Sequence, residues 1–150
     1  MDWARVLLIV HIAAAGTWLG GNIIQAVVPP LAARQGTAVA AGWYRVSAVL
    51  SARFYMPAAI LILLSGVTMV LIRDEISFAD TFVSIGIGMV IIGALLGKFV
   101  FDPGGRAAAE EIESGDQTPI RSAVGRLAAF GTIDTLLLLF TFTAMVFRWQ

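Results

Sequence analysis

The 150-residue sequence contains no cysteine and little charge, and both shortages restrict what the chain can be. Without cysteine there is no disulfide bond, no thiolate metal site and no cysteine nucleophile. Charged residues make up 13% of the chain, whereas a soluble domain usually carries about 25%. The formal net charge is zero, so nothing in it favours a nucleic-acid partner. Motifs of serine hydrolases, phosphate loops and dinucleotide-binding folds are also missing.

Four long apolar runs occupy most of the chain, and nearly all charges lie between them. Each run approaches or exceeds the roughly 20 residues that a helix needs to cross a bilayer. The first run is too long for the apolar region of a signal peptide. The sequence therefore predicts an all-α integral membrane protein, a single four-transmembrane-helix bundle over residues 1–150. Its helices are expected at residues 6–29, 54–72, 82–101 and 127–147.

Proline and glycine suggest where these helices end. Pro29 and Pro30 are expected to stop the first helix, because proline lacks the backbone donor that a helix interior needs. The sequence 102–105, Asp-Pro-Gly-Gly, is expected to end the third. Residues 38–52 could extend the second helix as a cytosolic or interfacial turn, and residues 106–116 are predicted to form a short solvated helix.

The distribution of lysine and arginine predicts the orientation. Cytoplasmic loops of membrane proteins carry an excess of these residues. Three lie at the termini and in the connection between the second and third runs, and seven lie in the other two connections and the adjoining helix ends: Arg34, Arg45, Arg53, Lys98, Arg106, Arg121 and Arg126. A bacterial-type inner membrane protein, multi-pass and with both termini outside, is expected.

Small residues predict close helix packing. Gly16 and Gly20 in the first run, and Gly93 and Gly97 in the third, are spaced four apart, which lets helix backbones approach. Packing within the bundle is the favoured interpretation, and a homodimer seam is the alternative.

Polar residues within the runs are the candidates for function, because ionisable groups in a membrane usually face the bundle interior or a cavity. In the first run His11, Trp18 and Gln25 recur every seven residues, so they share one face with Asn22. Depth along the helices, at about 1.5 Å per residue, predicts an inner polar cluster. Its members are Asn22, Gln25, Arg53, Lys98 and Asp134. Such a cluster would form a cytoplasm-facing vestibule for an anionic or polar ligand, with Lys98 able to pair with Asp134; structural pairing and lysine or arginine reaching lipid phosphates are the alternatives.

The outer half of the bundle carries a different set. His11, Met69 and Met145 are expected at similar depths, within about two turns of the outer surface. Imidazole and thioether groups suit Cu(I) and haem iron. These residues are therefore candidate metal ligands, although methionine is also an ordinary apolar filler and a lone histidine can be held by a neighbouring carbonyl.

Two segments resemble the CopD-like membrane proteins, a broad group that includes copper-resistance CopD, HemJ-type protoporphyrinogen oxidases and uncharacterised four-helix members. The first is residues 11–21, with His11 followed by Trp18-Leu-Gly-Gly; the second runs from Arg53 to Met69, with a Ser-Gly pair near its end. The HemJ-type resemblance implies that His11 is a haem ligand or an essential histidine and that Lys98 is the lysine of the third helix. The CopD-type resemblance implies a copper entry site at His11.

Three functions remain open. The first is a membrane protein that binds haem b or copper through His11, with Trp18 beside the cofactor. The second is a small ion or solute transporter that uses the inner cluster as its vestibule. The third is a structural subunit that binds a protein partner. No nucleophile–base pair or acid dyad is visible in the sequence, so catalysis would need a cofactor.

Overall fold

The computed structural model describes residues 2–115 and 122–148, and every regular element within them is helical. Four continuous helical stretches in these residues are long and apolar enough to cross a membrane, as expected: Trp3–Arg34, Thr37–Ile72, Thr81–Ser114 and Ala123–Phe147. They comprise α1 (Trp3–Arg34), α2 (Thr37–Leu50), η1 (Ser51–Tyr55), α3 (Met56–Ile72), α4 (Thr81–Leu96), η2 (Gly97–Phe101), α5 (Asp102–Ser114) and α6 (Ala123–Phe147). Arg121, counted above for the orientation, lies outside the described residues.

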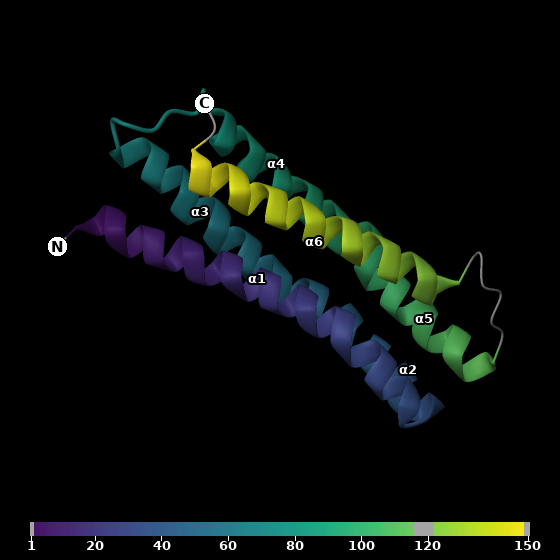
Figure 1. The fold of residues 1–150 in the computed structure, drawn as a ribbon. Helices are drawn as coiled ribbons and strands as arrows, with labels where there is room; N and C mark the ends of the chain where they lie inside the picture. The colour runs from purple at the N-terminus through teal and green to yellow at the C-terminus, as the bar shows by residue number, and fades with distance from the viewer. Residues whose placement is uncertain (1, 116–121, 149–150) are drawn as a thin grey trace.

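The helices form an elongated bundle whose two ends differ (Figure 1). The beginning of α1, the end of α3, the beginning of α4 and the end of α6 lie together, and we call this the terminal end. α2, α5 and the start of α6 lie at the opposite, loop end. Gly36, with φ of 115°, makes the sharp turn from α1 into α2, a backbone conformation that favours glycine.

The first helix continues through Pro29 and Pro30 to Arg34, so the expectation that it stops there was wrong. Proline removes the donor to the carbonyl four residues earlier, which here belongs to Gln25 and Ala26. All four residues line a large cavity. Irregular backbone hydrogen bonding is tolerated in membrane helices where it borders a cavity rather than lipid.

Two π-helical segments lie within the second and third long helices. η1 closes with a bond from Met56 N to Ser51 O, and η2 with one from Asp102 N to Gly97 O. Each is followed at once by the first turn of a new helix that contains a proline, Pro57 in α3 or Pro103 in α5. Widened turns of this kind accommodate a proline that a regular α-helix would not.

The two π segments also touch one another. The Ser51 hydroxyl donates to the Gly97 carbonyl oxygen at 2.8 Å. A Cβ at Gly97 would lie 3.0 Å from that hydroxyl oxygen, so glycine permits this contact. The two π segments are therefore linked by a side chain of one and a carbonyl of the other, and this carbonyl also accepts the bond from Asp102 N.

Residues 102–105 do not end the third helix, which was also a wrong expectation: α5 carries it on to Ser114. α2 likewise extends the second helix toward the loop end, as the sequence allowed. These stretches of 36 and 34 residues are roughly 50 Å long at about 1.5 Å per residue, well beyond a hydrocarbon core of about 30 Å. Between them, small residues allow close contact: a Cβ at Gly105 would lie 2.9 Å from Ala48 Cβ.

Large apolar side chains cover the outside of the bundle. Ile9, Leu64, Leu71 and Val146 are examples, each at least 60% exposed. Only 22–33% of the most apolar window of each long helix is buried. A monomeric soluble protein rarely exposes a continuous apolar surface of more than a few hundred Å². The surface is therefore one that suits lipid contact.

The spacing of the glycines predicted close helix packing correctly for one pair and wrongly for the other. Gly93 and Gly97 do lie against neighbouring helices, and a Cβ at Gly93 would come within 2.3 Å of the Trp18 ring. A Cβ at Gly16 or Gly20 would have no other atom within 4 Å. The expectation of close packing within the bundle thus holds for the second pair of glycines and is wrong for the first.

Candidate functional site

Two cavities lie inside the bundle. The smaller, toward the terminal end, has a volume of about 110 Å³ and is lined by residues of α1, α3, α4 and α6, including His11; we call it the His11 cavity. The larger lies toward the loop end, has a volume of about 960 Å³ and is bordered by Asp134 of α6; we call it the Asp134 cavity. Each cavity is lined by some of the residues that the sequence predicted to be functional.

His11 is held by α3 through one ring nitrogen. Its Nδ1 lies 3.0 Å from the Ile62 carbonyl oxygen and 3.0 Å from Ser65 Oγ. The Ser65 hydroxyl donates to the Leu61 carbonyl oxygen at 2.5 Å, which leaves its oxygen as an acceptor. Because a carbonyl oxygen can only accept, Nδ1 carries the proton of the neutral ring and Nε2 keeps its lone pair.

Gly66 makes this placement of His11 possible. A Cβ at Gly66 would lie 3.2 Å from His11 Cε1, tighter than an ordinary contact. Ser65 and Gly66 interrupt the apolar run of α3, and Ser65 is 3% exposed. The Ser-Gly pair was noticed in the sequence only as part of the CopD-like resemblance, and its role in orienting the imidazole was missed.

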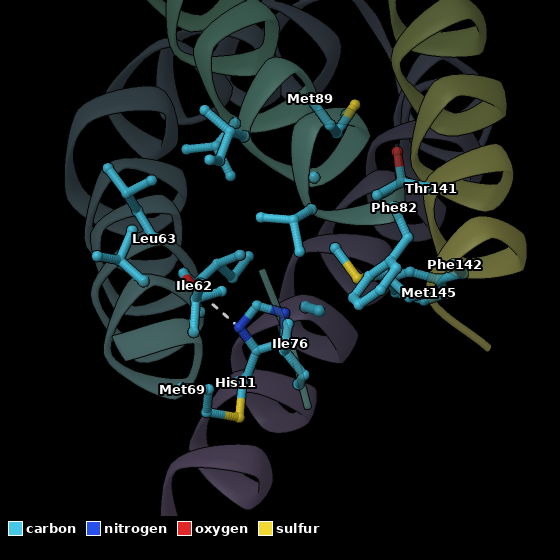
Figure 2. Close-up of a pocket in the computed structure, with 18 of the residues that line it drawn as sticks. His11, Ile62, Leu63, Met69, Ile76, Phe82, Met89, Thr141, Phe142 and Met145 are labelled. Carbon is cyan, nitrogen blue, oxygen red and sulfur yellow. Dashed lines mark hydrogen bonds between the residues drawn. The ribbon is translucent and has the colours of Figure 1, made fainter. Parts of the chain in front are cut away.

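The structure brings Met69 and Met145 to the same cavity as His11 (Figure 2). In Figure 2 the Met69 side chain lies beside the imidazole, and the Met145 sulfur points into the cavity from α6. Met89 of α4 also lines the cavity, although its sulfur points away from His11 in this view. No lysine, arginine, aspartate or glutamate is among the described residues that line it.

Trp18 is buried between the cavities and lines both of them. Its ring packs closely on Gly93, and its Nε1–H donates to Asp134 Oδ2 at 3.1 Å. Tyr55 of η1 meets the ring edge-on, with centroids 6.0 Å apart. Trp18 is thus fixed on several sides, and it forms the boundary between the two sites.

Asp134 is 2% exposed and has two protein donors on a single oxygen. Asn22 Nδ2 donates to Oδ2 at 2.8 Å, in addition to the bond from Trp18. Oδ1 has no hydrogen-bond partner within the described part of the chain. The sequence grouped Asn22 with Asp134 but assigned Trp18 to a cofactor at His11, so the bond from Trp18 to this carboxylate was missed.

The predicted inner cluster is only partly assembled. Asn22, Gln25 and Asp134 line the Asp134 cavity. Arg53 and Lys98 are exposed and are not among its lining residues. Lys98 Nζ instead lies 5.6 Å from the centre of the Phe99 ring, and no salt bridge to Asp134 is formed. His11 and Lys98 also do not share a cavity.

The Asp134 cavity contains groups that the sequence did not single out. Tyr44 of α2, Tyr55 of η1 and Glu111 of α5 all line it. Glu111 Oε2 accepts from Ala123 N at 2.6 Å, at the start of α6. Glu111 lies in the segment that was predicted as a solvated helix, and nothing in the sequence indicated that α5 would pack against α2 and α6.

Within residues 2–115 and 122–148 no group of three or more His, Cys, Asp and Glu side chains is placed to hold a metal ion. A metal site in the His11 cavity would therefore have one imidazole and thioether groups as its ligands. Comparison with known proteins finds no matching family model, no matching curated protein and no matching solved structure.

Proposed function

We propose that the chain is an integral membrane protein that binds one Cu(I) ion in the His11 cavity through His11, Met69 and Met145. The observation that carries this proposal is the position of the imidazole: Nδ1 is bonded to two acceptors of α3, and the ring lines one small cavity together with the thioethers of Met69 and Met145. A ligating histidine usually donates its other nitrogen to a carbonyl or carboxylate, which orients the ring and raises its basicity.

The chemistry of the lining favours a soft, singly charged ion. Thioether and imidazole groups select Cu(I) over harder ions. The described lining residues carry no carboxylate that could offset a second positive charge, and burying an unpaired charge is costly. His11 would supply the neutral nitrogen, and Met69 and Met145 would supply sulfur from α3 and α6.

The size of the cavity favours a single ion over haem b. Pockets for drug-sized ligands typically measure about 300–1,000 Å³, and the His11 cavity measures about 110 Å³. The larger cavity has the volume for such a group, but neither histidine nor methionine is among its described lining residues. Copper also agrees with the CopD-type resemblance of residues 11–21.

The proposed location is a bacterial-type inner membrane, with the terminal end outside. The loop end carries Arg34, Arg45, Arg106 and Arg126, as the positive-inside rule expects of a cytoplasmic side. α2 and α5 would then extend beyond the hydrocarbon core into the cytoplasm, where Arg45 and Glu113 form an exposed ion pair. The His11 cavity would face the outer half of the membrane.

The test is Cu(I) binding by the purified full-length chain in maltoside micelles, measured by competition with a chromogenic Cu(I) chelator. We expect one ion per chain, a loss of affinity of about 100-fold in His11→Ala and about tenfold in Met145→Leu. Met56→Leu is the matched control, because Met56 is exposed at the start of α3, outside the cavity. Equal affinity of His11→Ala and the unmodified chain would refute the site.

An absorbance spectrum of the same sample, before and after dithionite, separates copper from haem. A colourless sample that binds Cu(I) agrees with the proposal. A Soret band that shifts on reduction and disappears in His11→Ala would show that the chain binds haem through His11 and would refute the copper proposal.

A further inference from the structure

The second cavity contains a buried acidic oxygen that the protein leaves unpaired. Asp134 is 2% exposed, both of its protein donors bind Oδ2, and Oδ1 has no partner within the described residues. A buried charged group without a partner is strongly disfavoured, so Oδ1 is an open position for a proton, a water molecule or a positively charged group. This atom belongs to a different site from the one proposed for copper.

The charges around the cavity have one sign. Asp134 and Glu111 line it, and no lysine or arginine does so among the described residues. The titratable groups that face Asp134 across the cavity are Glu111 of α5 and the phenols of Tyr44 and Tyr55. None of these offers a positive charge to the carboxylate. The charges of the lining therefore favour a cation, in contrast to the anionic ligand that a cluster with Arg53 and Lys98 would bind.

The size and lining argue against a small inorganic cation. Calcium takes six to eight oxygen ligands, and magnesium demands near-ideal octahedral geometry. Here one carboxylate oxygen is free, and most of the surrounding lining is apolar or aromatic. A volume of about 960 Å³ instead suits an organic molecule. The aromatic walls at Trp18, Tyr44 and Tyr55 offer faces on which a large cation can lie.

The cavity opens between two helices. Several of its lining residues are also exposed, and they lie on the facing sides of α1 and α6 toward the loop end: Ala26, Pro30, Ala33, Ala128, Thr132 and Leu136. In a bilayer this opening would lie along the length of the helices. A ligand that partitions into the membrane could enter from the side.

From these observations we propose that the Asp134 cavity binds a lipophilic organic cation, with Asp134 Oδ1 as the counter-charge and the surrounding aromatic rings as its walls. Asn22 and Trp18 position the carboxylate by binding its other oxygen. The cation and a proton would compete for Oδ1, since each satisfies the same lone pairs.

The experiment uses two probes of nearly the same shape and opposite charge, tetraphenylphosphonium and tetraphenylborate. Their binding to the full-length chain in maltoside micelles is measured by equilibrium dialysis, with empty micelles as the blank. We expect saturable binding of tetraphenylphosphonium and none of tetraphenylborate. Asp134→Asn, which keeps the shape and removes the charge, should weaken tetraphenylphosphonium binding about tenfold or more.

Two further variants keep the test decisive if Asp134→Asn does not fold. Gly131→Leu adds a side chain from α6 into the cavity, and a Cβ at Gly131 meets no other atom within 4 Å. It should fold and should weaken binding by a similar factor. Lys98→Gln removes an exposed charge outside the cavity and should change nothing. Equal binding of both probes, or unchanged binding in folded Gly131→Leu, would overturn the proposal.

Discussion

The two cavities share Trp18 as a wall but offer opposite chemistry. The His11 cavity is small, and its described lining carries neutral donors without a carboxylate. The Asp134 cavity is almost nine times larger in volume and holds a buried carboxylate with one unpaired oxygen. Trp18 therefore lies between the site proposed for a soft metal ion and the site proposed for an organic cation.

Gly93→Ala should have the largest effect, because it displaces the wall that the cavities share. The added Cβ would lie 2.3 Å from the Trp18 ring, which is 3% exposed and held by its hydrogen bond to Asp134. We expect a loss of about 3 kcal/mol of unfolding free energy, at the upper end for overpacking, measured by denaturant titration in mixed micelles.

Gly88→Ala is the control for Gly93→Ala, since a Cβ there meets no other atom within 4 Å. It should be neutral or slightly stabilising. Adding Trp18→Phe to Gly93→Ala should restore part of the lost stability, because the smaller ring vacates the space. A destabilisation that is equal in Gly93→Ala and Gly88→Ala would show that Trp18 is not a rigid wall.

Trp18→Phe by itself should affect the Asp134 cavity more than the His11 cavity. It removes the Nε1–H donor to Asp134 Oδ2 and leaves Asn22 as the only protein donor to that oxygen among the described residues. Losing a hydrogen bond to a charged group, together with some volume, should cost about 2 kcal/mol of unfolding free energy. Tetraphenylphosphonium affinity should change several-fold, and Cu(I) affinity should change less; the reverse order would contradict the separation of the sites.

Ser65→Ala should have the smallest effect and should be confined to the His11 cavity. It removes one of the two acceptors at His11 Nδ1 and leaves the Ile62 carbonyl in place. Outer hydrogen bonds to a metal ligand are worth about 10–100-fold in affinity, so we expect a loss of about tenfold in Cu(I) binding. Thr68→Val is the matched control, because the Thr68 hydroxyl bonds only the Leu64 carbonyl among the contacts resolved. Equal losses in both variants would count against a role for Ser65.

The sequence predicted how deep a residue lies in the bundle better than it predicted the direction in which the side chain points. Residues His11, Met69 and Met145 were expected at one level, and they line one cavity. For Arg53 and Lys98 a similar argument placed them level with Asp134, yet both side chains are exposed. Each lies in a π-helical segment, where the wider turn changes the angle at which following residues leave the helix axis. Helical periodicity in the sequence assumes a constant angle and could not show this.

The helix ends illustrate a second limit. Proline in a sequence indicates a break, but tertiary context decides whether the helix continues. Pro29 and Pro30 border a cavity, and Pro103 directly follows a π segment, so all three are accommodated within long helices. Neither the cavity nor the π segment has a recognisable local sequence pattern. The acidic character of the larger cavity depended on these same features, because the continuation of the third long helix through Pro103 brings Glu111 to it.

The position of Trp18 gives the protein an intrinsic optical signal. Its indole N–H is bonded to the carboxylate of one cavity, while its ring also forms a wall of the other. Indole emission depends on the electric field across the ring, so a positive charge placed on either side would alter its colour. In a variant whose other three tryptophans are replaced by phenylalanine, the fluorescence of Trp18 would thus record the occupancy of both compartments without an external label.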